Sequence, residues 1–310
     1  MNKDFISIHD ITRYEFHELL DLAVEIKEHP DKHRKALKGQ VLAMVFEKPS
    51  LRTRMTFEVG MYELGGTGIY LSPAEIQIGK RETVEDVAHN LERWVDGIMI
   101  RTFGHDNVVR LARAASVPVI NGLSDLSHPC QAMADFLTLR EKKGGLSKIK
   151  LTYVGDGNNV CHSLMLAAAK AGTKMAVGTP KGYEPSPEMV KLALEDGKDT
   201  GFELLLTNDP KEAARDADAI YTDVWASMGQ ESEKEARAKI FAPYQVNAAL
   251  FAAAKPDAIF LHCLPAHREE EVSTEIFESY RSVVFDEAEN RLHAQKAIMV
   301  TLMGNGKNNG

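Results

Sequence analysis

The chain has 310 residues and a formal net charge of -8 at pH 7, with 44% hydrophobic and 26% charged residues. This length suggests two domains, and the composition is that of an ordinary globular protein. The negative net charge argues against a nucleic-acid partner, which would need a basic surface to pair with phosphates. The sequence has only three cysteines with no CxxC pair and no apolar run long enough to span a bilayer. We therefore expect a cytoplasmic protein without disulfides, structural zinc or a membrane partner.

Apolar segments typical of strands alternate with amphipathic segments typical of helices along the whole chain. The predicted strands are Val41–Glu47, Gly68–Leu71, Gly97–Arg101, Pro118–Asn121, Lys150–Val154, Lys174–Gly178, Glu203–Thr207, Ala219–Asp223 and Ile259–Cys263. The predicted helices include Thr53–Leu64, Val84–Val95, Val108–Ala115, Gln131–Glu141, Val160–Ala171, Glu188–Leu194 and Gln245–Ala254. This alternation predicts an α/β fold with parallel sheets flanked by helices on both faces. The polar, glycine-rich segment Lys142–Gly145 is the best candidate for the boundary between two such domains.

The segment Phe46–Arg54 runs from a strand into a predicted helix that begins near Ser50. The N-terminus of a helix offers free N–H groups and a partial positive charge, and so binds phosphate. Ser50 and Thr53 add hydroxyl groups. Arg52 and Arg54 add positive charges that the helix dipole disfavours at this end, and a bound anion would remove that conflict. The pattern favours a phosphate site over a capped helix with solvated arginines.

Two other segments of the first half carry polar groups just after predicted strands. Arg101 ends one strand, where ligands bind in open α/β sheets, although an ion pair at the surface is an equal alternative. His128 lies in Ser127–Gln131, which opens a helix. A histidine there can donate a hydrogen bond to a carbonyl oxygen as negative charge grows on it, and Gln131 can bind an amide. The alternative for His128 is a helix cap.

The segment Gly155–Val160 lies between a strand and a helix and partly matches a dinucleotide-binding fingerprint. Its third glycine is missing, and the following strand ends in Gly178-Thr179-Pro180 rather than in an acid, which disfavours a nicotinamide site. Two asparagines at the start of the helix, Asn158 and Asn159, could instead hold a carboxylate. A tight turn with a helix cap is the alternative.

Three later segments complete the set of candidates. Asp223 ends a predicted strand and can pair with an amine, whereas Cys263, in His262–Pro265, offers a thiol, although a lone cysteine is more often buried and inert. The segment Glu287–Arg291 by itself has the pattern of solvated charge, with Arg291 opening the last helix. The candidates lie at or near the carboxyl ends of predicted strands, so we expect a shared cleft that takes an anion and an amino acid.

The segments Ser50–Arg54 and His128–Gln131 together resemble the carbamoyl-phosphate signature of the aspartate/ornithine carbamoyltransferase family. The resemblance covers nearly the whole chain. Asp223 with Ser227–Gly229, and also His262–Pro265, resemble the ornithine branch of that family. The resemblance implies transfer of a carbamoyl group from carbamoyl phosphate to ornithine, giving citrulline and phosphate, in arginine biosynthesis or in the reverse direction in arginine degradation.

The resemblance also implies an organisation for the protein. It implies a carbamoyl-phosphate-binding domain over residues 1–143 and an ornithine-binding domain over residues 148–290. The last helix, 291–303, is expected to pack back on the first domain. The family is built on a homotrimer, so a trimer or a multiple of trimers is expected. Neither a metal nor an organic cofactor is implied.

Individual residues take roles from the same resemblance. Those implied to bind carbamoyl phosphate are Ser50, Leu51, Arg52, Thr53, Gln77, Arg101, His128, Gln131, Cys263, Leu264 and Arg291. Those implied to bind ornithine are Asn159 and Met228 at its α-carboxylate, and Asp223 and Ser227 at its α-amine. The catalytic residues implied are Thr53, Arg101 and His128 at the carbamoyl carbonyl, and Cys263 with Asp223 at the reacting amine.

Other functions are weighed against this one. The acceptor could be aspartate, putrescine or acetylornithine, although an aspartate pocket should replace Asp223 with a cation and a putrescine pocket would leave Asn159 without a carboxylate to bind. A nicotinamide dehydrogenase built on Gly155–Val160 is a second alternative. A non-catalytic protein that binds an amino acid or phosphate is a third, and it leaves His128 and Cys263 unexplained.

Overall fold

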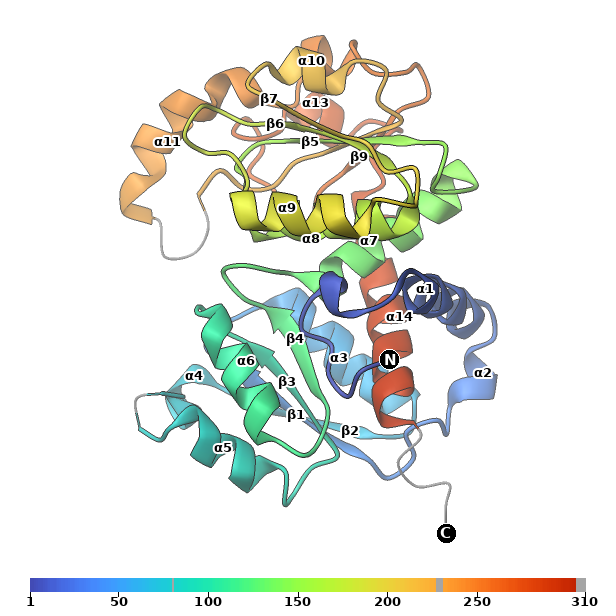
Figure 1. The fold of residues 1–310 in the computed structure, drawn as a ribbon, viewed down its shortest axis with the longest axis vertical. Helices are drawn as coiled ribbons and strands as arrows, with labels where there is room; N and C mark the ends of the chain where they lie inside the picture. The colour runs from blue at the N-terminus through green and yellow to red at the C-terminus, as the bar shows by residue number, and fades with distance from the viewer. Residues whose placement is uncertain (80, 227–230, 305–310) are drawn as a thin grey trace. The chain divides into compact units, whose positions relative to one another are not determined.

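The computed structural model describes residues 1–79, 81–226 and 231–304 of the chain. The chain forms two compact units (Figure 1). The first comprises Met1–Leu137 together with Glu289 and the residues after it, and the second comprises Thr138–Ala288. Each unit is built on its own parallel sheet with helices on both faces, so the predicted fold class is confirmed. The predicted domain bounds, and the substrate assigned to each domain, stay predictions.

The first unit holds a sheet of four strands. They are β1 (Val41–Phe46), β2 (Thr67–Leu71), β3 (Gly97–Arg101) and β4 (Val119–Leu123). The spatial order is β2-β1-β3-β4, and every neighbouring pair is parallel. The chain moves to one side of β1 to form β2 and to the other side to form β3. The carboxyl ends of β1 and β3 therefore flank a switch point, where ligands of open α/β sheets bind.

Helices cover both faces of the first sheet. Its helical elements are η1 (Ile8–Asp10), α1 (Arg13–Glu28), α2 (Pro30–His33), α3 (Leu51–Glu63), α4 (Pro73–Ile76), α5 (Val84–Leu91) and α6 (His105–Ala114), with parts of α7 (Pro129–Lys143) and α14 (Val284–Met303). Val45, Ile98 and Ile100 pack in one core cluster with residues of α5 and α6. On the other face, a Cβ atom at Gly97 would lie 3.0 Å from the sulfur of Met303 in α14. Strands covered on both sides are apolar throughout, which is why the sequence revealed them.

The second unit holds a sheet of five parallel strands in the order β7-β6-β5-β8-β9. They are β5 (Lys150–Val154), β6 (Lys174–Gly178), β7 (Leu204–Thr207), β8 (Ala219–Tyr221) and β9 (Ile259–Leu261). The helical elements are α8 (Asn159–Ala171), α9 (Pro187–Asp196), α10 (Pro210–Ala214), η2 (Glu231–Glu233), α11 (Lys234–Phe241), η3 (Ala242–Tyr244), α12 (Ala248–Phe251) and α13 (Thr274–Phe277). Figure 1 shows α8 and α9 on one face and α10 and α13 on the other. The switch point here lies between β5 and β8.

Several predicted bounds were wrong at element ends, for identifiable reasons. β9 ends at Leu261, not Cys263, because the N–H of His262 donates to the side chain of Glu287 instead of to a neighbouring strand. β8 likewise ends at Tyr221, two residues before Asp223. The helix predicted over Gln245–Ala254 is only α12, Ala248–Phe251, because the N–H of Val246 pairs with the carbonyl of Glu271.

Candidate active site

The N-terminus of α3 presents hydroxyl and N–H groups directly after β1. Ser50 is the N-cap residue, and its Oγ accepts from the N–H of Thr53 at 3.2 Å. The first turn of this 13-residue helix holds no acidic residue. Leu51 turns away, with its side chain 74% exposed, so only its backbone is placed to contact a ligand here. The turn has the open N–H groups and the lack of acids expected of an anion site.

Two buried arginines meet Thr53 from other elements. The Nη2 of Arg291 donates to Thr53 Oγ1 at 2.9 Å, and the Nη1 of Arg101 reaches the same oxygen at 3.5 Å. Arg291 also donates to Oε1 of Gln131, whose Nε2 in turn donates to Asp135 at 2.7 Å. The prediction that Arg291 opens the last helix was wrong, because α14 already begins at Val284. The fold nevertheless brings Thr53, Arg101, Gln131 and Arg291 together.

The charges in this group repel one another. Burial, with the charges of Arg291 and Arg101, holds the pKa of His128 well below its ordinary value, so the imidazole is neutral. Burial and the nearby guanidinium of Arg101 lower the pKa of Lys48 in the same way. An anion would reverse the repulsion, since an opposite charge close by favours the charged form. The group therefore suits a small anion beside a carbonyl that a neutral histidine can polarise.

Two expected members of this group, Arg52 and Gln77, do not join the hydrogen bonds described above. Arg52 is half-buried in the first turn of α3, where its carbonyl accepts from Thr56. Gln77 follows α4 in a left-handed conformation, φ 46°, and its side chain is exposed. Within the described residues, no hydrogen bond joins the Gln77 side chain to Thr53 or its neighbours. Lys48 was missed, although it lies in the same segment, Phe46–Arg54, as Ser50.

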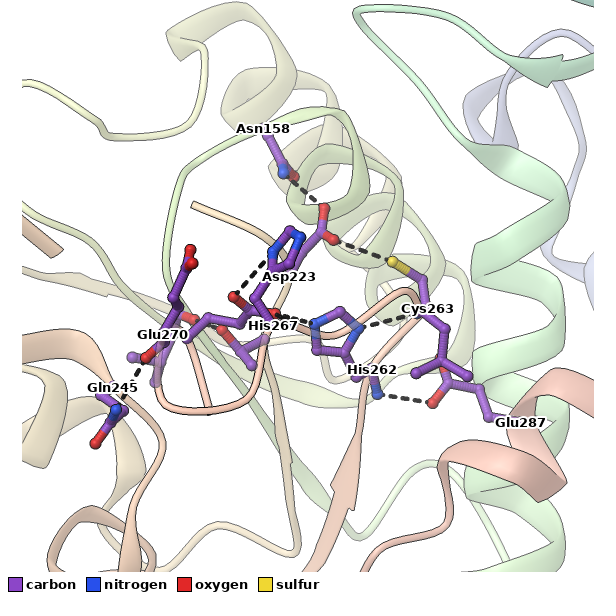
Figure 2. A network of polar contacts seen from close by, with 12 residues as sticks. Asn158, Asp223, Gln245, His262, Cys263, His267, Glu270 and Glu287 are labelled. Carbon is purple, nitrogen blue, oxygen red and sulfur yellow. Dashed lines mark hydrogen bonds and ion pairs between the residues drawn. The ribbon is translucent and has the colours of Figure 1, made fainter. Parts of the chain in front are cut away.

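The second unit gathers a separate polar group around Asp223. The Nδ2 of Asn158 donates to Asp223 Oδ2 at 2.8 Å, and the Sγ of Cys263 donates to Asp223 Oδ1 at 3.1 Å (Figure 2). Asn158 follows β5 and caps α8, Asp223 follows β8, and Cys263 follows β9. Three neighbouring strand ends thus deliver one carboxylate, one amide and one thiol. Such a group can bind an ammonium ion and hold a nucleophilic amine beside a sulfur.

The contact between Asn158 and Asp223 was not predicted, because the sequence offered Asn158 and Asn159 only as groups that could hold a carboxylate. Asn158, not Asn159, contacts Asp223, while Asn159 is the half-buried first residue of α8 and accepts from Ser163 through its carbonyl. The sequence offered both asparagines at a helix start and could not separate them. The predictions for Ser227 and Met228 lie outside the described residues.

The turn His262–Leu264 is held by two buried acids that sequence reasoning missed. The N–H of His262 donates to Glu287 at 2.9 Å, and its Nε2 lies 3.1 Å from Glu271. His262, Glu271 and Glu287 are all 0% exposed. Glu287 belongs to a segment that by sequence resembled solvated charge. Because α14 begins at Val284, this glutamate lies inside the protein, where it also accepts from Tyr221 at 3.2 Å.

Two clusters offer ligand atoms at metal-binding spacing. The atoms of Asp223, His262 and Cys263 lie within 4.8 Å of one another, as do those of His267, Glu270 and Glu271. Both ring nitrogens of His262 already take part in hydrogen bonds, to Leu264 and to Glu271. A metal at the first cluster would have to break one of them. This cost favours reading Asp223 and Cys263 as groups that contact a substrate.

Comparison with known proteins identifies the family. Residues 3–141 match the model described as the carbamoyl-P binding domain of aspartate/ornithine carbamoyltransferase, and residues 147–302 match its Asp/Orn binding domain. The chain belongs to the aspartate/ornithine carbamoyltransferase family. Two relatives are named ornithine carbamoyltransferase. One, from Thermococcus kodakarensis, is 55% identical over 97% of this chain and 96% of its own length, and the other, from Anoxybacillus flavithermus, is 54% identical over the same shares.

Solved structures of the family match the fold as well. The ornithine carbamoyltransferase of Pyrococcus furiosus superposes with a TM-score of 0.95 at 51% identity, covering 97% of each chain. That of Thermus thermophilus superposes with a TM-score of 0.88 at 49% identity, covering 98% of this chain and 99% of its own. Among the described residues, no helix is both long and apolar enough to cross a membrane.

Proposed function

We propose that this chain transfers the carbamoyl group of carbamoyl phosphate to the side-chain amine of L-ornithine, giving L-citrulline and phosphate. The family and the names of its relatives support the reaction. The observation that carries the choice of acceptor is the buried carboxylate of Asp223, held by Asn158 and Cys263. A carboxylate suits the two amines of ornithine, whereas the second carboxylate of aspartate would need a cation there.

Carbamoyl phosphate is assigned to the group around Thr53. The open first turn of α3, with Ser50, the backbone of Leu51, and Arg52, binds the phosphate together with Arg101. Arg291 adds a second buried guanidinium beside Thr53. Gln131, which Arg291 orients, and the backbone at Cys263 and Leu264 bind the carbamoyl nitrogen. Gln77 is assigned to the phosphate on the resemblance alone.

Ornithine is assigned to the group around Asp223. Asp223 binds the α-amine together with Ser227, and Asn159 and the backbone of Met228 bind the α-carboxylate. Asn158 is added here as the residue that orients the Asp223 carboxylate, because its amide donates to Oδ2. Cys263, on the other oxygen of Asp223, is assigned to the reacting amine.

The chemical step needs a neutral amine. An ornithine side chain resembles lysine, whose pKa is about 10.4, so at pH 7 only about one molecule in a few thousand is neutral, a cost of roughly 4–5 kcal/mol. Cys263 first passes its thiol proton to Asp223, 3.1 Å away, and the thiolate then accepts a proton from the ornithine ammonium, whose neutral nitrogen bonds to the carbamoyl carbon. Thr53, Arg101 and the neutral His128 stabilise the resulting oxyanion. The oxyanion re-forms the carbonyl as the bond from carbon to phosphate oxygen breaks, the nitrogen gives its second proton to the departing phosphate, and hydrogen phosphate leaves into the arginines.

Four parallel incubations test the acceptor. The chain is mixed with carbamoyl phosphate and either ornithine, aspartate, putrescine or N-acetylornithine, and the carbamoylated product is measured by mass spectrometry. The proposal requires citrulline at a rate far above that of the other three products. Faster product from aspartate would overturn the assignment of Asp223, and faster product from putrescine would overturn that of Asn159. Either result would leave the carbamoyl-phosphate half standing.

The direction of the reaction in the cell is proposed to be arginine biosynthesis. One relative from Pyrococcus furiosus, 51% identical over 97% of this chain, is named anabolic. The chemistry itself runs either way, so the degradative direction is the alternative. A cytoplasmic location is proposed because all three cysteines are free, as expected in a reducing compartment.

A homotrimer, or a multiple of trimers, is proposed as the assembly. Leu51, Met55 and Tyr62 lie along one face of α3 with exposed fractions of 74%, 47% and 82%. Contiguous apolar side chains of this kind are typical of subunit interfaces. Light scattering behind a sizing column measures the mass, and a monomer would overturn the proposal.

A further inference from the structure

His262 is hydrogen-bonded through its backbone N–H and through both ring nitrogens, next to the turn that carries Cys263. The N–H of Leu264 donates to His262 Nδ1 at 2.9 Å, so the ring is bonded to the residue two positions further along its own chain. On its other side, Nε2 lies 3.1 Å from Oε1 of Glu271. Figure 2 shows His262 between the turn and Glu287, which accepts from its backbone. Cys263 therefore stands between two residues whose backbones are both fixed.

The contacts determine the tautomer of the ring. A backbone N–H can only donate, so Nδ1 of His262 must carry a lone pair and Nε2 must carry the hydrogen. Nε2 then donates to the carboxylate of Glu271. This carboxylate is itself buried, and its Oε1 also accepts from the N–H of His267 at 2.6 Å. Although burial acts to raise the pKa of Glu271, its hydrogen bonds with His262 prevail and lower it, so the acceptor stays ionised.

The turn needs such support because its backbone is unfavourable. Leu264 has φ 59°, the left-handed region that a residue with a branched side chain rarely adopts. A conformation of this kind persists only where the surroundings hold it, and it is found often at functional sites. The bond from Leu264 N–H to His262 Nδ1 is a direct restraint on that backbone.

We propose that His262, oriented by Glu271, is a positioning residue that holds the Leu264 turn and thereby sets the Cys263 thiol against Asp223. The proposal rests on the proposed roles of Cys263 and Leu264 in the reaction. It adds a function to a histidine and a buried glutamate that neither substrate is assigned to contact. If His262 had a purely structural role, loss of either ring nitrogen would change kcat to the same extent in the folded protein.

Two variants separate the two nitrogens. In His262→Asn the side-chain oxygen replaces Nδ1 and still accepts from Leu264, while the bond to Glu271 is lost. In His262→Gln the amide reaches toward Glu271, while no acceptor remains for Leu264. A misplaced catalytic group costs up to about 100-fold in rate, so we expect His262→Gln to lose about 10- to 100-fold in kcat. His262→Asn should lose clearly less kcat than His262→Gln, because it loses only the orientation by Glu271 and keeps the acceptor for Leu264.

The rate at which iodoacetamide alkylates Cys263 gives a readout that does not depend on turnover. Cys130 and Cys161 are buried and act as internal controls in the same peptide map. In His262→Gln the thiol loses its carboxylate neighbour, whose negative charge disfavours the thiolate, so alkylation should be several-fold faster. His262→Asn should react more slowly than His262→Gln, because it keeps the acceptor for Leu264. Equal alkylation rates and equal kcat in the two variants would overturn the proposal.

A second pair keeps the test decisive if His262→Gln fails to fold. Glu271→Gln retains an oxygen for Nε2, whereas Glu271→Met has a similar volume without an acceptor. The proposal requires a faster alkylation of Cys263 and a lower kcat in Glu271→Met only. If the unaltered protein makes no citrulline, the proposed function fails, and the alkylation contrast still decides the positioning role. If it makes citrulline and the contrast is missing, the positioning role alone fails.

Discussion

The Nη2 of Arg291 donates to the Oγ1 of Thr53 at 2.9 Å, across 238 positions of the sequence. The same guanidinium donates to Gln131. Its planar fork can hold several acceptors in a fixed geometry, whereas a lysine ammonium is a single flexible point charge. Arg291 thus organises the proposed carbamoyl-phosphate group from a helix that begins far along the chain.

Replacing Arg291 with lysine should therefore raise the KM for carbamoyl phosphate by about 10-fold or more, although the charge is kept. The measurement is the initial rate against carbamoyl phosphate at saturating ornithine. Arg54→Lys is the matched control. Arg54 follows Thr53 directly in α3, but its guanidinium is exposed and pairs with Glu58. An equal effect of the two replacements would remove Arg291 from the binding group.

His128 should act as a neutral donor throughout the working pH range. Burial and the nearby arginines hold its pKa well below the ordinary value, so it stays uncharged as pH falls toward 6. His128→Ala should lower kcat by about 100-fold, the typical cost of removing one oxyanion donor. The shape of kcat against pH should be the same in both proteins. An acid limb near pH 6.5 that disappears in the variant would show that His128 titrates and would contradict this account.

Asp156 gives a pH dependence of stability. It pairs with Arg237, yet burial outweighs that charge and raises its pKa to about 6 from 3.8. The folded chain therefore holds the proton more tightly than the unfolded chain. Its contribution to stability is full below pH 3.8 and is lost as pH rises through about 6.

The variant Asp156→Asn cannot titrate and isolates this contribution. The free energy of unfolding of the unaltered protein, relative to the variant, should fall by at most about 3 kcal/mol between about pH 4 and 7. Urea unfolding of both proteins at each pH measures the difference. A difference that grows with pH would mean that Arg237 dominates and that the pKa of Asp156 is lowered instead.

Cys263 and Asp223 should be coupled in catalysis. Cys263→Ser keeps a hydroxyl donor toward Asp223 but removes the thiol, so kcat should fall much more than the affinity for carbamoyl phosphate, which is assigned mainly to another group of residues. Asp223→Asn should lower kcat as well, and the double replacement should cost less than the product of the two, because the 3.1 Å contact joins them. Steady-state rates measure kcat, and rapid-mixing experiments measure the affinity for carbamoyl phosphate. Near-normal turnover of Cys263→Ser would remove the thiol from the chemistry.

The sequence allowed the sheets to be predicted because their central strands are buried on both faces. Runs such as Val41–Phe46 and Lys150–Val154 are apolar with helical segments between them, and this pattern is local. Element ends were less predictable because they depend on distant partners. Nothing near His262 in the sequence reveals that its N–H will bond to Glu287 rather than to a strand.

In the candidate site, too, residues with a local signal could be predicted and residues that depend on distant partners could not. Ser50 and Thr53 could be found because a helix start after a strand is a local signal. Arg291 could be named only from the resemblance, since its approach to Thr53 depends on how α14 packs. Asn158 was named without its bond to Asp223, and Glu271 and Lys48 were missed, because these roles come from burial and from distant residues.

A competition assay tests the central claim most directly. The protein is given carbamoyl phosphate labelled with carbon-13 in the presence of equal concentrations of ornithine and aspartate, and the labelled products are identified. Labelled citrulline with no labelled carbamoyl-aspartate is the result that the assignment of Asp223 predicts. Labelled carbamoyl-aspartate as the main product would contradict it, and label in neither product would contradict the proposed transfer itself.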